Sequence, residues 1–146
     1  APVISHFHEK RTNMWTLSSL SLAIILFTSA YLIGLGLLSI GKPHLAARFL
    51  LGFAQTAKRH YLELMLRTLI GGALIYYSTA MLFATCVEYV GWGLVGTTFL
   101  MTLTPWRLHQ RFAQKFVPYA NRHLKLIGGA SFLFGSCLLI AVRLFE

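Results

Sequence analysis

The chain contains an internal repeat that joins basic segments to apolar ones. Residues 48–60 and 111–123, which lie 63 positions apart, share Arg, Phe, Phe, Ala, Arg and His at matching places. The same pentapeptide, Leu-Ile-Gly-Gly-Ala, follows each copy at 69–73 and 126–130. A sequence repeat of this kind reflects a repeated structural unit. We therefore interpret the chain as two copies of one unit, in which an apolar helix, a basic connector and a second apolar helix follow one another.

Four long apolar runs decide the fold class. They span about 15–40, 64–84, 87–103 and 126–144, in a chain of 146 residues that is 56% hydrophobic and 12% charged. As helices, such runs cross a hydrocarbon core of about 30 Å, whereas open strands would leave backbone groups unpaired in lipid. The sequence therefore predicts an all-α membrane protein with four transmembrane helices, arranged as two repeated hairpins.

The repeat also predicts the boundaries of these hairpins. A polar, irregular arm at 1–13 precedes the first hairpin, 14–86, whose connector is 41–63. The second hairpin covers 87–146 and has its connector at 105–125. Each hairpin thus supplies two of the four helices and one basic connector.

Positive charge is concentrated in the connectors. Thirteen Lys and Arg against four acidic residues give a formal net charge of +9, and ten of the cations fall within 41–67 or 105–125. Because short loops rich in Lys and Arg stay on the cytoplasmic side, we expect both connectors in the cytoplasm, or in the mitochondrial matrix. Both termini are then expected on the opposite side of a bacterial or mitochondrial inner membrane. A basic chain also suits nucleic acid, but the apolar runs favour lipid, and no nucleic-acid partner is expected.

Each connector has an apolar face and a basic face. A proline, Pro43 or Pro105, opens each one and suits the first turn of a helix. Apolar residues then recur every four positions, through Ala57 in the first copy, and the aromatic ones are Phe49, Phe53, Phe112 and Phe116. The side chains expected to contact lipid headgroups or a partner are Arg48, Lys58, Arg59, His60, Arg107, Arg111, Lys115, Arg122 and His123. Such a helix lies in the headgroup plane, where anionic lipid attracts each basic residue by about 1 kcal/mol. Bound phospholipid is therefore the expected ligand, and packing of the connectors on the protein's own core is the alternative.

The histidines are the candidates for a cofactor site. His60 and His123 are equivalent in the repeat and follow Arg59 and Arg122, so we expect them at the same depth. The favoured interpretation is a headgroup-level clamp at the entry of the second and fourth helices. Paired axial ligands of a haem, a quinone site or a small-anion site are the alternatives. No metal site and no catalytic residue is predicted, because the carboxylates are scattered and the hydroxyl residues have no base at motif spacing.

Small residues mark the expected helix contacts, since they let transmembrane helices approach closely. The glycines concerned are Gly34, Gly71, Gly72, Gly128, Gly129 and Gly135. Because the two glycine pairs are equivalent in the repeat, we expect the second and fourth helices to meet across a pseudo-twofold axis. Cys86 is expected near the outer surface and Cys137 deeper, which disfavours a disulfide.

The second half of the chain resembles a known type of membrane protein. From Gly93 through Pro105-Trp106 and 126–130 to Arg143, it is similar to small uncharacterised two-helix proteins of the bacterial inner membrane, the YjeT-like type. Those proteins have a helix, a proline-containing basic turn and a second helix that opens with paired glycines. The resemblance implies a tandem duplication of such a unit here and an inner-membrane location, and it implies no activity. A weaker similarity to four-helix DoxX-like proteins rests on Glu63 and 71–73.

The sequence therefore favours a non-catalytic accessory, assembly or scaffold subunit of a larger inner-membrane complex. Its expected partners are anionic lipids and other membrane subunits, and no enzymatic activity is expected. A redox-linked protein that binds haem or quinone near His60 and His123 is the first alternative. A small transporter is the second.

Overall fold

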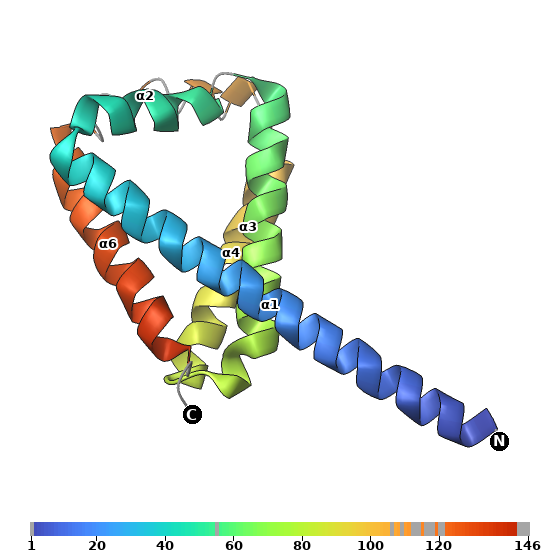
Figure 1. The fold of residues 1–146 in the computed structure, drawn as a ribbon. Coiled ribbons are helices and arrows are strands. Elements are labelled where there is room, and N and C mark those ends of the chain that lie inside the picture. Colours follow the sequence, from blue (N-terminus) through green and yellow to red (C-terminus); the bar gives the residue numbers. More distant parts are fainter. Residues whose placement is uncertain are drawn as a thin grey trace.

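In a computed structural model the chain is all-helical, as the apolar runs predict. The structure describes residues 2–54, 56–105, 107–108, 110–111, 115, 119 and 122–142, with the side chains of these except 2–12, 51, 53 and 54. Its elements are α1 (Pro2–Gly41), α2 (Pro43–Ala54), α3 (Ala57–Tyr77), the 3-10 helix η1 (Ser78–Ala80), α4 (Ala84–Leu103) and α6 (Leu124–Ala141). Figure 1 shows α1 beside α6 and α3 beside α4, while α2 lies across the ends of α1 and α3.

Three of these helices are long and apolar enough to cross a membrane. They are α1 over Asn13–Gly41, α4 and α6, with mean hydropathies of 2.2, 1.2 and 1.8. The fourth predicted span corresponds to α3, which at about 1.5 Å per residue is long enough. Glu63, Arg67 and the terminal tyrosines lower its hydropathy, and α3 is not among the candidate spans.

Two segment boundaries differ from those predicted. The polar arm is helical, because α1 begins at Pro2 and runs for 40 residues with no proline or glycine between positions 3 and 33. The expected second span at 64–84 is displaced, because α3 ends at Tyr77 and the chain then forms η1 and a turn.

The first connector is a helix of its own. Pro43 begins α2, as predicted, and the amide of Lys42 makes the last bond of α1, to the Leu38 carbonyl at 2.8 Å. However, α2 ends at Ala54, and Thr56 caps a new helix by accepting the Arg59 amide at 3.4 Å. The predicted continuous run through Ala57 is therefore wrong, because a threonine at this position favours a helix start over helix continuation.

Helices α1 and α6 approach each other backbone to backbone. A Cβ built on Gly36 would lie 2.7 Å from the Gly128 carbonyl oxygen, and one built on Gly128 would lie 3.1 Å from the Gly36 carbonyl oxygen. The second Cβ would also lie 2.5 Å from the Ser39 Cβ. Further along α6, a Cβ on Gly135 would lie 2.9 Å from the Ser29 carbonyl oxygen. Real Cβ atoms cannot occupy these places, so only glycine permits this approach.

Helices α3 and α4 cross in the same reciprocal way. A Cβ on Gly71 would lie 3.0 Å from the Gly91 carbonyl oxygen, and one on Gly91 would lie 2.9 Å from the Gly71 carbonyl oxygen. Side chains pack on both sides of this crossing. The Cβ on Gly71 would lie 2.8 Å from the Val95 side chain, and the Cβ on Gly91 would lie 2.7 Å from the Ile75 side chain.

These two crossings correct the expected helix pairing. Gly71 of α3 faces Gly91 of α4, and Gly128 of α6 faces Gly36 of α1, so the two repeated glycine pairs do not meet each other. Each pair uses only its first glycine, because Cβ atoms on Gly72 and Gly129 would meet nothing within 4 Å. Of the remaining predicted packing residues, Gly135 lies in a contact and Gly34 has open space around it.

The turn after α3 is fastened to the end of α6. The Leu82 amide donates to the Ala141 carbonyl at 2.8 Å, and Met81 forms an antiparallel bridge with Val142. Met81 and Val142 are both buried in the cluster of apolar side chains that also holds Leu74. We call this the loop end of the molecule, and the opposite end, where α2 lies and α3 begins, the connector end (Figure 1).

The two cysteines lie at the loop end. Cys86 of α4 and Cys137 of α6 are both free, and both line one hollow of about 280 Å³ between these helices. The two thiols thus lie in the same region of the molecule, and their expected difference in membrane depth stays a prediction.

The paired glycines give a matched test of the crossings. Gly71→Ala and Gly128→Ala should each lower the free energy of unfolding by about 1–3 kcal/mol, because the added methyl group overpacks a backbone contact. Gly72→Ala and Gly129→Ala should leave it unchanged or raise it by up to about 1 kcal/mol, since alanine is the better helix former. Denaturant unfolding in mixed micelles measures all four. Equal effects within each pair would contradict the crossings.

Candidate functional site

The predicted contact residues gather at the connector end. Arg48 lies on α2, and Lys58 and Arg59 lie in the first turn of α3, all with exposed side chains. In the second connector the predicted contact residues are also exposed; they are Arg107, Arg111, Lys115, Arg122 and His123. Every Lys and Arg with a described side chain belongs to 42–67 or 107–125. The described part of the molecule therefore has one strongly basic end.

Helix α2 rests on the bundle with one face and leaves apolar side chains uncovered. Ala46 is fully buried, and the ring of Phe49 lies 6.5 Å from the ring of Tyr31 on α1. Phe49 nevertheless stays 44% exposed and its neighbour Leu45 41% exposed. Half-exposed apolar side chains beside exposed cations are the arrangement of a helix at a membrane surface. The side chain of Phe53, and the residues Phe112 and Phe116, lie outside the described part of the structure.

Arg59 holds α2 in place. Its Nη1 donates to the carbonyl oxygen of Gly52, in the last turn of α2, at 2.6 Å. The carbonyls at a helix C-terminus carry partial negative charge and lack partners within the helix, so a cation stabilises them. Arg59 is thus engaged within the chain, whereas among the described residues Arg48 and Lys58 make no hydrogen bond or ion pair. Nothing in the sequence indicated that Arg59 would bond within the chain whereas Arg48 and Lys58 would not.

A second polar contact joins α3 to the end of α4. Arg67 Nη1 lies 3.3 Å from Glu63 Oε1, one turn away, and 3.6 Å from the sulfur of Met101. Its Nε is buried and has no hydrogen-bond partner among the described residues. The pair removes net charge from the entry of α3 into the bundle, and that lowers the cost of placing α3 in an apolar environment. Sequence reasoning placed both charges near this entry but missed the pairing and the role of Met101.

The two repeat histidines have different surroundings. His60 is 2% exposed, with the ring of Tyr61 at 5.7 Å. His123 is exposed at the start of α6, with the ring of Tyr119 at 5.6 Å. The described residues contain no group of three or more His, Cys, Asp or Glu that could hold a metal ion. The two rings therefore differ in burial within the protein, while their equal depth in a membrane stays a prediction.

Buried serines are the interface residues that sequence reasoning missed. Ser29 and Ser39 are almost fully buried on the face of α1 that meets α6. The Ser29 hydroxyl donates a hydrogen bond to the Ile25 carbonyl at 2.9 Å, so it brings no unpaired polar group to the contact. Positions 29, 32, 36 and 39 follow one helix face at alternating spacings of three and four, and this pattern is the signal that identifies the seam.

Comparison with known proteins does not connect this geometry to an established function. No family model, no curated protein and no solved structure matches the chain.

The role of Arg59 is testable against its neighbour. Arg59→Gln should remove a charge-assisted hydrogen bond worth about 1–3 kcal/mol, so that the amides of α2 exchange with deuterium roughly tenfold faster or more. Lys58→Gln, which removes the same charge one residue away, should leave exchange in α2 unchanged. Hydrogen-exchange mass spectrometry of both variants in lipid nanodiscs makes the comparison. If the two substitutions loosen α2 equally, general electrostatics and not the bond to Gly52 holds this helix.

Proposed function

We propose that this chain is a non-catalytic accessory or scaffold subunit of an inner-membrane complex. In this proposal the chain binds anionic lipid at its connector end. The observation that carries the proposal is the clustering of charge: every Lys and Arg with a described side chain belongs to 42–67 or 107–125, and the first of these ranges includes α2 with its partly exposed apolar side chains. A surface of this kind binds anionic headgroups with its cations and the acyl boundary with its apolar residues.

In this proposal α3 is a fourth transmembrane helix. It packs along α4 through the Gly71 crossing, and α4 is itself a candidate span. The pairing of Glu63 with Arg67 lowers the penalty for charged side chains near the end of the span. The two hairpins then have the same direction in the membrane, with both connectors on the cytoplasmic or matrix side.

The large exposed surface of the helices favours the part of the proposal that concerns a partner protein. Only 28% of the most apolar window of α1 is buried within the molecule, as is 17% of that of α4 and 28% of that of α6. Near the start of the α1 span, Leu17 and Leu20 are exposed as well. Such surfaces face either acyl chains or the helices of other subunits.

Extraction of the native complex in polymer-bounded lipid particles tests the proposal. We expect the chain to elute in a stoichiometric assembly whose retained lipid is enriched in anionic species. Arg48→Gln with Lys58→Gln should remove about 2 kcal/mol of attraction, which is a loss of roughly thirtyfold in preference for anionic lipid. Arg48→Lys with Lys58→Arg keeps both charges and should keep the preference. A lone chain surrounded by lipid of bulk composition would contradict both parts of the proposal.

A further inference from the structure

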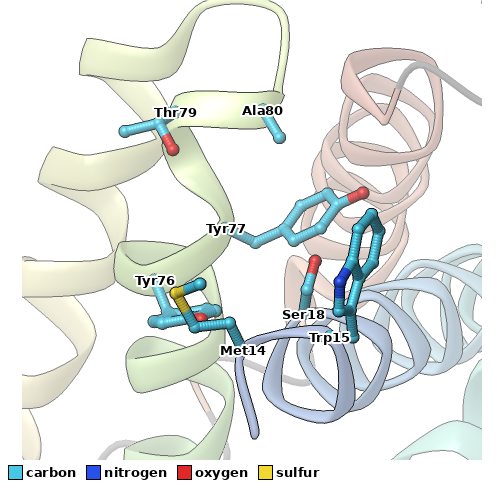
Figure 2. Close-up of a pocket in the computed structure, with 7 residues that line it drawn as sticks. All are labelled: Met14, Trp15, Ser18, Tyr76, Tyr77, Thr79 and Ala80. Carbon is cyan, nitrogen blue, oxygen red and sulfur yellow. The ribbon is translucent and has the colours of Figure 1, made fainter. Parts of the chain in front are cut away.

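A second polar site lies at the opposite end of the molecule. A pocket of about 570 Å³ opens between the first turns of the α1 span and the end of α3. Met14, Trp15 and Ser18 line it from α1, and Tyr76, Tyr77, Thr79 and Ala80 line it from α3 and η1 (Figure 2). Its volume is within the range of about 300–1,000 Å³ that is usual for small-molecule sites.

The described residues of the lining carry hydrogen-bonding groups and no charge. Figure 2 shows Tyr77 extending from α3 toward Trp15 and Ser18 of α1, with Thr79 on another side of the hollow. Within the described part of the chain, the side chains of these four residues make no hydrogen bond. The Trp15 indole can only donate, and the three hydroxyls can donate as well as accept. All four side chains can therefore donate hydrogen bonds to the acceptor oxygens of a ligand.

Charge narrows the class of ligand. None of the described residues that line the pocket is acidic or basic, so they offer no counter-charge to an anion or a cation. The protein as a whole carries +9, which disfavours a cation further. A neutral ligand fits this environment best, because it brings no charge that would have to be desolvated.

The aromatic side chains add a requirement of shape. Trp15, Tyr76 and Tyr77 supply three flat faces around one hollow, and flat faces bind planar rings by offset stacking or edge contact. The sulfur of Met14 is a further favourable partner for an aromatic ring.

We propose that this pocket binds a neutral planar ring that bears carbonyl oxygens and an apolar tail, the chemistry of membrane quinones. The ring lies between the aromatic side chains, the carbonyl oxygens accept from the Trp15 indole and the Tyr77 or Ser18 hydroxyl, and the tail extends from the mouth of the pocket into the surrounding acyl chains. This site is at the loop end, away from the histidines of the connector end, and binding there requires no redox step by the protein.

Fluorescence of a single tryptophan tests the site, because quinones quench tryptophan on close approach. The variant Trp92→Phe/Trp106→Phe keeps only Trp15, and Trp15→Phe/Trp106→Phe keeps only Trp92, which is exposed on α4 outside the pocket. Both are reconstituted in phosphatidylcholine nanodiscs and titrated with decylubiquinone. We expect saturable quenching of Trp15 and, for Trp92, only the non-saturating quenching that follows partition of the probe into lipid.

Pocket variants identify which contacts bind the ring. In the Trp15-only protein, Tyr77→Ala should raise the dissociation constant about tenfold through loss of an aromatic contact, and Tyr77→Phe should raise it roughly two- to tenfold through loss of one hydrogen bond. Ser18→Leu fills the hollow without removing a ring and should abolish saturation. Decanol, which has the tail without the ring, should not compete. Equal non-saturating quenching of both tryptophans, or displacement by decanol or by added phospholipid, would overturn the proposal.

Discussion

Close contact between helix backbones at two glycine crossings is the interaction on which the rest of this structure depends. Helices in lipid gain no hydrophobic free energy by leaving the lipid for one another, so their association relies on van der Waals packing at short range. At Gly71 with Gly91, and at Gly36 with Gly128, each glycine would place a missing Cβ within about 3 Å of the other's carbonyl oxygen. Contacts this close also favour Cα–H···O interactions between helices. They pair α3 with α4 and α1 with α6.

The pairing has a consequence for the two ends of the molecule. Each crossing joins two helices that the sequence repeat assigns to different hairpins, so the closest packing is between the predicted hairpins and not within them. At the loop end, the bond from Leu82 to Ala141 closes the bundle and leaves an aromatic pocket beside it. At the connector end, Arg59 bonds to the last turn of α2. The exposed side chains of Arg48 and Lys58 make no such bond in the described structure. Among the described side chains, the two ends thus present different surfaces, one basic and one with polar but uncharged groups.

The helical class, the start of α2 at Pro43 and the basic end could be predicted from sequence, because apolar length, proline geometry and charge are local properties. Helix pairing could not, because Gly71 shows only that some backbone can approach, and its partner Gly91 lies outside the repeated pentapeptide. The end of α2 was missed because the apolar spacing through Ala57 competes with the capping of a new helix by Thr56, and the cap prevails. Sequence spacing also could not show that Arg59 bonds to α2 whereas Arg48 and Lys58 do not, because that difference depends on tertiary geometry.

The pairing of the helices is the central claim, and cross-linking of engineered cysteine pairs tests it most directly. In a background of Cys86→Ser and Cys137→Ser, one variant carries Arg67→Cys with Met101→Cys, whose native side chains are in contact between α3 and α4 at 3.6 Å. A second variant carries Gly72→Cys with Gly129→Cys, where an added Cβ meets nothing within 4 Å, so that the substitutions leave both crossings intact. This second pair would meet if the repeated glycine pairs faced each other. Treatment with a short bifunctional maleimide in membranes, followed by mass spectrometry, should show the first pair joined and the second free, and the reverse result would contradict the structure described here.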